Sequence, residues 1–220
     1  MNKEKIILVG GQGKMGQVVF EELKNDYEIC IVEKNDCLKS VTKADLVIDF
    51  ASAESSVVSA EFCRKNKIPL IVGSTGQNEI QMKKIKETSK EVAVLKCGNF
   101  SVGMALVRKL VCEILKTGVE DVVIFEKHHK NKKDAPSGTA KELQKLVNAQ
   151  TKTKVQMLFA RGGSEIGTHE ISFYFGDEVV SLKHQAFSRK SFAKGVKIAV
   201  EHMLRTIPEG LIKFDDVVKF

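Results

Sequence analysis

The chain of 220 residues has no tryptophan, only two tyrosines and three prolines, and no long apolar run. No stretch approaches the roughly 20 apolar residues that a membrane-spanning helix needs. The opening M-N-K-E-K leads directly into a short apolar segment that lacks the character of a signal peptide. We therefore expect a cytoplasmic protein with no membrane partner.

Cysteine is also poorly organised for a structural role. The five cysteines form no C-x-x-C pair, and an odd number spread through expected strands and helices is typical of reduced thiols in a reducing compartment.

The sequence also lacks the histidine motifs of metal sites, since it contains neither H-x-H nor H-E-x-x-H. His169 and His184, at expected strand edges, are interpreted as hydrogen-bonded structural residues. We predict no disulfide framework and no metal.

The scarcity of aromatic residues limits what the positive charge can bind. The formal net charge is +7, with lysine spread along the whole chain. Without tryptophan and with little tyrosine, no platform for stacking nucleic-acid bases is visible, so we predict no nucleic-acid partner. A positive cleft also raises the on-rate of small polyanions, and we favour that use of the charge.

What the chain does contain is a regular alternation of short apolar runs with segments of helical spacing through its first hundred residues. The hydrophobic content of 43% is sufficient for a sizeable core. Such alternation predicts a parallel sheet covered on both faces by helices. The expected strands are 5–9, 28–32, 45–50, 70–73 and 92–95, and the expected helices are 14–24, 54–65 and 79–89.

After Asn99 the pattern changes to longer, alternating strands. The three final strands predict a meander that ends in an antiparallel hairpin around Gly176 and Asp177. The fold class is therefore α/β, with a Rossmann-type N-terminal sheet and an α+β C-terminal domain. We expect one domain at 1–99, with the tail 207–220 packing back on it, and a second at 100–206. The expected elements of this half are helices 102–117, 138–149 and 192–205 and strands 122–126, 154–160, 168–175 and 178–186.

The segment G-G-Q-G-K-M-G contains G-x-G-x-x-G at Gly11, Gly13 and Gly16. It follows an expected strand and opens a helix, and Glu33 ends the next strand. Glycines let the backbone approach a pyrophosphate, whose charge is met by N–H groups at the helix N-terminus. This context predicts a dinucleotide site, and a tight glycine turn without ligand is the alternative.

Glu33 and Lys34 bear on the choice of dinucleotide. A carboxylate accepts hydrogen bonds from ribose hydroxyls and repels a 2′-phosphate, whereas the neighbouring cation attracts that phosphate. NADH and NADPH both remain open on these two residues. It is equally open that Lys34 is a solvated turn residue.

The segment E-K-H-H-K-N-K-K-D-A-P-S-G-T-A places two adjacent histidines before a helix start. The N–H groups at a helix start formed by Gly138 and Thr139 predict a carboxylate site, to which Lys132 and His129 add positive charge. A histidine with a near-neutral pKa can give up a proton as a substrate gains a hydride. The alternative is a solvated basic loop in which Ser137 is only a helix cap.

This segment is similar to the signature E-x-H-H-x-x-K-x-D-A-P-S-G-T-A of the 4-hydroxy-tetrahydrodipicolinate reductase (dihydrodipicolinate reductase) family, in its compact form. The resemblance covers nearly the whole chain, with several departures. Residues 34–44 are shorter than in longer members, Ser74 replaces a common threonine, and Cys97 and Gly98 replace small alanines. The family's order is also followed by G-G-Q-G-K-M-G, D-F-A-S, G-S-T-G, N-F-S-V-G, R-G-G, G-T-H-E, H-Q-A-F-S-R and F-A-K-G.

The resemblance implies a homotetramer, joined through the second domain's sheet, that reduces a cyclic dicarboxylate with NADH or NADPH in lysine biosynthesis. His128 is the implied proton donor and acceptor, and Lys132 a second proton donor. The second domain is implied to bind substrate and the first to bind the dinucleotide. The implied substrate-binding residues are His129, Ser137, Gly138 and Thr139. The implied cofactor-binding residues are Gly10, Gly11, Gln12, Gly13, Lys14, Met15, Glu33, Lys34, Gly73, Ser74, Thr75, Cys97, Gly98, Asn99 and Phe100.

Overall fold

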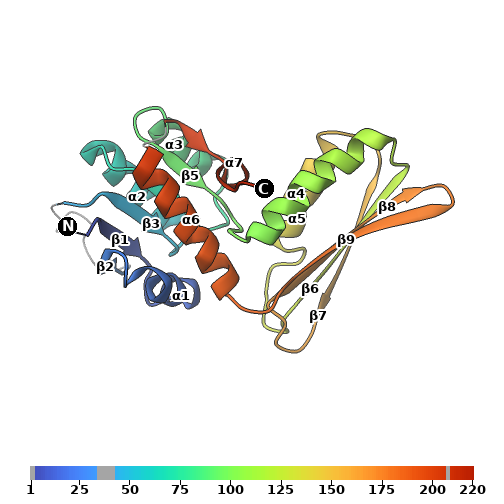
Figure 1. Cartoon of the computed structure of the whole chain (residues 1–220), viewed down its shortest axis with the longest axis horizontal. Coiled ribbons are helices and arrows are strands. Elements are labelled where there is room, and N and C mark those ends of the chain that lie inside the picture. The colour runs from blue at the N-terminus through green and yellow to red at the C-terminus, as the bar shows by residue number, and fades with distance from the viewer. Residues whose placement is uncertain (1–2, 34–42, 207–208) are drawn as a thin grey trace. The chain divides into compact units, whose positions relative to one another are not determined.

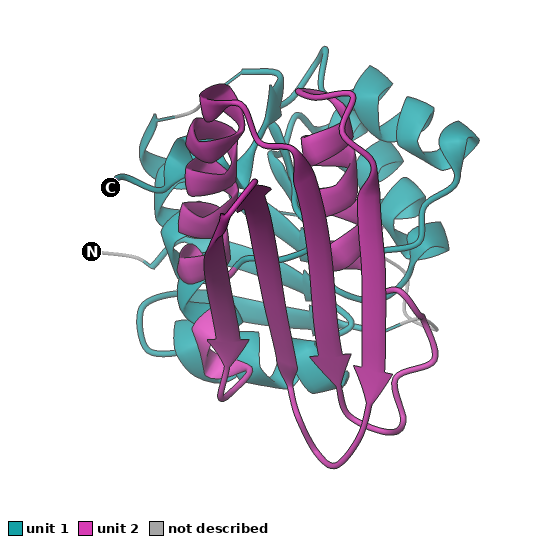
Figure 2. Cartoon of the chain, turned by 90° about the vertical axis from the view of Figure 1, so that its right-hand side faces the viewer, with its two compact units in different colours: residues 1–100, 192–219 teal, residues 101–191, 220 magenta. Residues whose placement is uncertain are grey.

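The computed structural model describes residues 3–33, 43–206 and 209–220 (Figure 1). The chain forms two compact units, residues 1–100 with 192–219, and residues 101–191 with Phe220 (Figure 2). Within the described residues, no helix combines the length and apolarity required to cross a bilayer.

The first unit contains a six-stranded parallel sheet, as the alternation of strands and helices predicted. Its strand order is β10-β5-β4-β3-β1-β2, so the chain reverses its direction across the sheet between β1 and β3. In sheets of this kind, ligands bind beyond the carboxyl ends of the strands at that switch point. The strands are β1 (Lys5–Val9), β2 (Glu28–Val32), β3 (Leu46–Asp49), β4 (Leu70–Val72), β5 (Val94–Lys96) and β10 (Leu211–Ile212).

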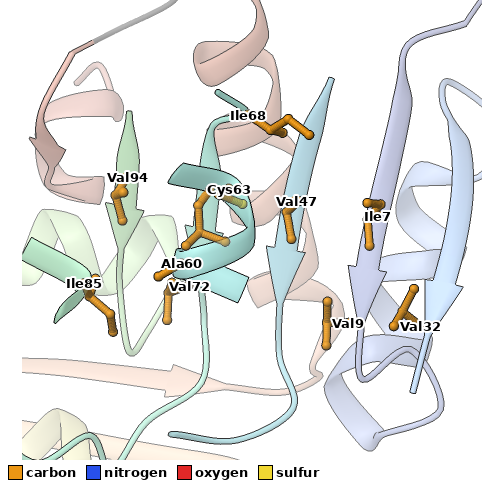
Figure 3. Close-up of a cluster of buried hydrophobic side chains, with 11 residues drawn as sticks. Ile7, Val9, Val32, Val47, Ala60, Cys63, Ile68, Val72, Ile85 and Val94 are labelled. Atoms are coloured by element: carbon orange, nitrogen blue, oxygen red, sulfur yellow. The ribbon is translucent and has the colours of Figure 1, made fainter. Parts of the chain in front are cut away.

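Aliphatic side chains fill the space between this sheet and its helices. Figure 3 shows strand residues such as Val47 and Val72 gathered with Ala60 and Cys63 from α2 and Ile85 from α3. The central strands β3 and β4 are buried along their whole length, because helices cover both faces of a parallel sheet. The helices of this unit are α1 (Lys14–Leu23), α2 (Ala53–Asn66), α3 (Glu79–Thr88), α7 (Phe214–Val217) and most of α6 (Lys190–Thr206).

The placement of α6 differs from the expected boundary, which assigned residues 192–206 to the second domain. In the structure these residues belong to the first unit. Lys197 of α6 donates to Asp26 at 2.6 Å, and the helix buries an apolar face. Farther along the tail, β10 extends the parallel sheet beside β5, and the Phe214 ring meets the Phe100 ring edge-on at 5.1 Å.

The second unit contains a four-stranded sheet in the order β7-β6-β8-β9. The hairpin β8–β9 is antiparallel, as predicted, but the expected meander of three strands is wrong. Strand β7 pairs in parallel with β6, because the chain between them crosses over through α5. The strands are β6 (Asp121–His128), β7 (Val155–Arg161), β8 (Gly167–Phe175) and β9 (Glu178–Ala186).

Two helices, α4 (Val102–Ile114) and α5 (Gly138–Asn148), cover one face of this sheet. The segment expected as one helix over 102–117 ends in a short 3-10 turn, Leu115–Thr117. In Figure 2 the helices of this unit lie behind its four strands, and the face toward the viewer carries no helix of the unit. Strand β6 also runs two residues beyond its expected end, so His128 is its last residue.

Candidate active site

The glycine loop leads from β1 into α1 at the switch point of the parallel sheet. Gly16 packs directly on the loop, since a Cβ at this position would lie 2.1 Å from the carbonyl oxygen of Gly10. The loop residues Gln12, Gly13 and Lys14 are exposed, whereas Gly10 and Gly11 are buried. The loop therefore presents its tip and the first turn of α1 to solvent.

The N-terminus of α1 lacks the side-chain cap that four other helices have. Helices α2, α3, α4 and α5 are each capped by a serine or asparagine side chain. In contrast, the cap residue of α1 is Gly13, which offers no side-chain acceptor, and the first turn, with Lys14 and Met15, contains no acidic residue. Unfilled N–H donors at a helix start suit a phosphate group, so this loop fits a dinucleotide.

Glu33 lies beside the glycine loop, as the spacing predicted. Its carboxylate accepts a hydrogen bond of 2.7 Å from the backbone N–H of Gln12. The acidic side chain is therefore held next to the loop where a ribose would follow the pyrophosphate. Lys34, the other residue invoked for cofactor choice, lies outside the described residues.

Asp49, at the end of β3, is a buried carboxyl group that the sequence reasoning missed. Its carboxylate accepts from the Ser55 and Ser59 hydroxyls, both at 2.7 Å, and from the N–H of Ala51 at 3.0 Å. Burial raises the pKa of Asp49, and the hydrogen bonds from the serines oppose that rise. The group thus fixes the turn that follows β3 beside the glycine loop. The sequence signal that could have pointed to it is the stretch D-F-A-S, which begins at Asp49.

The segments after β4 and β5 reach the same edge of the sheet. Gly73 and Ser74 donate their N–H groups to the Asp49 carbonyl at 2.8 and 3.2 Å. Ser74 is buried and Thr75 is exposed. After β5, the Cys97 thiol lies 3.1 Å from the Asn99 carbonyl, with Gly98 between them. The predicted cofactor residues of unit 1 therefore gather at the carboxyl ends of its strands.

Phe100 closes this edge with an aromatic contact. Its ring is buried and lies 5.8 Å from the ring of Phe50, which follows β3. Phe100 therefore joins the ends of two strands by apolar packing, and its ring is covered on the side that Phe214 occupies. The residue is placed as part of the wall of the site and contributes no polar group.

In the second unit, His128 is held at the end of β6 with 7% of its surface exposed. Its Nδ1 contacts the carboxylate of Glu126, and its ring meets the His169 ring edge-on at 5.2 Å. Burial lowers the pKa of His128, while the charge of Glu126 and its hydrogen bond raise it. The ring can therefore exchange a proton in a setting that excludes most water. The Glu126 contact was not predicted.

His129 and Lys132 lie in the turn after β6. The His129 N–H donates to the Glu165 carbonyl at 2.8 Å, and its side chain is half-buried. The Lys132 ammonium donates to the Asp134 carboxylate at 2.7 Å. Lys132 therefore faces an internal acid, and its positive charge still contributes to lowering the pKa of His128.

Asp134 occupies the position that was predicted for a substrate carboxylate. Burial opposes ionisation of its carboxyl group, but hydrogen bonds from Lys132 and from the backbone of Gly138 lower its pKa overall. Gly138 itself is exposed, and Thr139 beside it is half-buried. The predicted carboxylate trap therefore already holds one carboxylate, which belongs to the chain.

Ser137 caps helix α5. Its hydroxyl accepts from the N–H of Ala140 at 3.2 Å and lies 3.2 Å from Nε2 of His169. The capping role, left open by the sequence, is therefore present. Burial and the nearby positive groups lower the pKa of His169 to about 3, so this ring is neutral. A neutral ring at this distance can bond the hydroxyl without bringing a second positive charge to His128.

Glu126, His128 and His169 offer ligand-type atoms within 4.8 Å of one another. The Glu126 carboxylate is bonded to His128, to the N–H of Ser137 and to Arg161, which neutralises its charge. We therefore assign these three residues to hydrogen bonding within the protein. The absence of a metal stays a prediction.

Two family models together match nearly the whole chain. The model described as "Dihydrodipicolinate reductase, N-terminus" matches residues 4–100, and "Dihydrodipicolinate reductase, C-terminus" matches residues 102–218. The junction between the two matches coincides with the passage of the chain from the first unit to the second, at residues 100–101, whereas the C-terminal match also includes residues 192–218 of the first unit.

Similar proteins carry a consistent name. A 4-hydroxy-tetrahydrodipicolinate reductase of Clostridium novyi (strain NT) is 33% identical over 248 residues, which covers 98% of both chains. One from Wigglesworthia glossinidia brevipalpis is 39% identical over 173 residues, covering 76% of this chain and 65% of that protein. The dipicolinate-bound dihydrodipicolinate reductase of Paenisporosarcina sp. TG-14 is 19% identical, with a TM-score of 0.81, and covers 98% of this chain and all of that one, a likeness of fold.

Proposed function

Because the chain belongs to the dihydrodipicolinate reductase family, we propose that it reduces 4-hydroxy-tetrahydrodipicolinate to tetrahydrodipicolinate, with His128 as the proton donor. The protein is an oxidoreductase of the diaminopimelate route to lysine. The observation that carries the residue assignment is the buried His128 ring, held by Glu126 within the unit that also contains the carboxylate trap.

The dinucleotide belongs on unit 1. Its pyrophosphate would lie at the glycine loop and the uncapped start of α1, and Glu33 would meet a ribose. When bound, NADH or NADPH supplies the hydride, so that substrate, reduced cofactor and one proton give product, oxidised cofactor and water. NADH and NADPH remain equal candidates, since Glu33 alone does not select between them.

The substrate belongs on unit 2. One of its carboxylates would replace Asp134 on Lys132 and on the N–H of Gly138, since that pair already binds a carboxylate. His129 and Thr139, half-buried on either side of this pair, would contact the same substrate. Lys132, once released from Asp134, would be free to act as the second proton donor.

The test is oxidation of NADH and of NADPH in the presence of substrate, which a coupling synthase generates from pyruvate and aspartate semialdehyde. We expect oxidation that depends on the synthase and on both precursors, with at least one cofactor. Omitting the synthase gives the matched blank. No substrate-dependent oxidation with either cofactor would remove the proposed function.

We propose a homotetramer in the cytoplasm, and the exposed face of the sheet of unit 2 supports the oligomeric part of this proposal. The face opposite the helices exposes Leu158, Tyr174 and Val179, and Val123 and Phe125 are only half-buried on it. Exposed apolar and aromatic side chains on a sheet face that also carries polar residues are typical of an interface between subunits. Light scattering coupled to gel filtration should give four times the chain mass, and Leu158→Glu should lower it. A monomeric wild type would contradict the tetramer.

A further inference from the structure

Glu126 is a completely buried carboxylate with a partner on each oxygen. It lies two residues before His128 on β6, so both side chains project from the same face of the sheet. One carboxylate oxygen contacts Nδ1 of His128. The other accepts from Nη2 of Arg161 at 2.7 Å and from the N–H of Ser137 at 3.2 Å. The carboxylate is thus fixed on both sides.

Arg161 is itself held in place. It ends β7, in register beside His128 of the parallel neighbour β6. Its Nη2 also donates to the Asp134 carbonyl at 2.6 Å, and its Nη1 donates to the Ala160 carbonyl at 2.8 Å. A buried carboxylate is stable only when it is paired and hydrogen-bonded, and Arg161 meets that need. The same guanidinium therefore ties Glu126 to the turn that carries Lys132.

The opposite side of the His128 ring has no comparable partner. Within the described part of the chain, Nε2 makes no hydrogen bond, and it faces Gly167 of β8. A Cβ at Gly167 would lie 2.9 Å from Nε2. Because glycine has only a hydrogen at this place, no side chain of residue 167 covers the nitrogen. The ring thus has one nitrogen held by the protein and one left for another molecule.

We propose that Glu126, clamped by Arg161, is the positioning residue of His128, accepting its Nδ1–H so that Nε2 exchanges the proton with the substrate. This inference rests on the proposed function, because it assigns the proton transfer to His128. The proton leaves Nε2 as the substrate gains the hydride, and it returns to Nε2 from solvent. The Glu126 carboxylate stabilises the imidazolium form of His128.

The charges around His128 make this role testable. Burial disfavours the imidazolium, and the nearby cations Lys132 and Arg161 oppose it as well. His169, which faces the ring from β8, is neutral, and Asp134 is engaged by Lys132. Among the described residues around the ring, Glu126 is therefore the anion that keeps the pKa of His128 from falling further.

The first experiment compares Glu126→Gln with wild type. We expect kcat to fall about 100-fold, with KM changed by less than about threefold, since a general acid acts mainly in the transition state. The pH above which kcat declines should also move lower, because the imidazolium loses its counter-charge. Glu126→Asp, which keeps the charge, should restore part of this shift. Glu165→Gln, which removes a carboxylate paired with Lys127, is the matched control. It should leave the dependence of kcat on pH unchanged.

If kcat falls in Glu126→Gln but the pH above which kcat declines does not move, the role of Glu126 is purely structural. That result would overturn the proposal. If the variant does not fold, the wild type itself decides. Nitrogen NMR shifts of its neutral His128 ring, assigned by comparison with His128→Gln, should show the Nδ1–H tautomer. The Nε2–H tautomer would overturn the proposal. This readout needs no substrate, so failure of the proposed reaction would be recognised separately, by the oxidation assay alone.

Discussion

The two units solve the problem of binding an anion in opposite ways. In unit 1 the start of α1 has no side-chain cap, and Gly13 leaves its N–H donors to an incoming group. In unit 2 the start of α5 is capped by Ser137, and Asp134 already engages Gly138 and Lys132. The glycine loop of unit 1 thus leaves backbone donors open to a ligand, whereas in unit 2 side chains hold one another, and the proposed substrate would have to replace one of them.

The two units also differ in whether their polar groups can take part in proton transfer. The groups that the glycine loop would offer to a phosphate are backbone amides, which cannot change protonation state near neutral pH. His128 and His169 are buried and titratable, and burial is the main cause that lowers the pKa of each ring. Binding and proton transfer should therefore be separable by single substitutions.

The largest expected effect separates proton transfer from binding. His128→Gln removes the ionisable ring while it keeps a similar size, so kcat should fall by about 10²- to 10³-fold, with KM nearly constant. Steady-state kinetics measures both values. Lys133→Ala, an exposed cation in the same turn, is the control and should retain wild-type kcat. An equal loss of kcat in both variants would show that turnover depends on the positive charge of the turn and not on the His128 ring.

The next effect should appear only in cofactor binding. In Gly16→Ala the new methyl group would lie 2.1 Å from the Gly10 carbonyl oxygen, so the glycine loop must shift. Its N–H groups would then be misdirected, and we expect the dissociation constant of NADPH to rise about tenfold or more. Fluorescence titration of the reduced nicotinamide measures it. The pH above which kcat declines should stay at its wild-type value. A change in that pH would show that cofactor binding by unit 1 and proton transfer by unit 2 are not separate.

A smaller effect tests the cap of α5. Ser137→Ala removes the acceptor for the Ala140 N–H and the partner of His169, which should lower the free energy of unfolding by about 1 kcal/mol. Denaturant titration followed by circular dichroism measures the change. Ser101→Ala, at the cap of α4, provides a matched comparison within the same unit. An unchanged stability would mean that the α5 cap contributes nothing.

The smallest effect concerns the carboxylate that occupies the unit 2 site. Asp134→Asn keeps the shape of the side chain but removes its negative charge from Lys132 and Gly138. A dicarboxylate such as dipicolinate should then bind about threefold more tightly, because it no longer displaces an ion pair. Calorimetric titration gives the constant. Markedly weaker binding would show that Asp134 shapes the site more than it competes for it.

Much of the open site could be predicted from sequence, because its information is local. Glycine spacing after a strand and an acid at the end of the next strand define the loop at Gly11, Gly13 and Gly16 with Glu33 beside it. The paired strands and helices of unit 1 follow from apolar periodicity. In the same unit, the buried carboxylate of Asp49 was missed, since apolar periodicity does not distinguish it from an ordinary strand end.

The support around His128 could not be predicted, because it depends on which strands are neighbours. The expected meander places β7 beside β8, whereas β7 actually lies beside β6 and brings Arg161 into register with His128. The expected end of β6 at Glu126 also concealed that His128 shares a strand face with Glu126. Long-range pairing through the α5 crossover sets both relations, and local periodicity does not report it.

In the proposed division of labour, unit 1 binds the dinucleotide and His128 of unit 2 supplies the proton. The most direct test is the single-turnover rate of cofactor oxidation in His128→Gln, measured over a range of NADPH concentrations at saturating substrate. We expect a limiting rate about 100-fold below wild type and a half-saturating NADPH concentration within about twofold of the wild-type value. A wild-type limiting rate together with weaker NADPH saturation would show that His128 acts in cofactor binding and does not supply the proton.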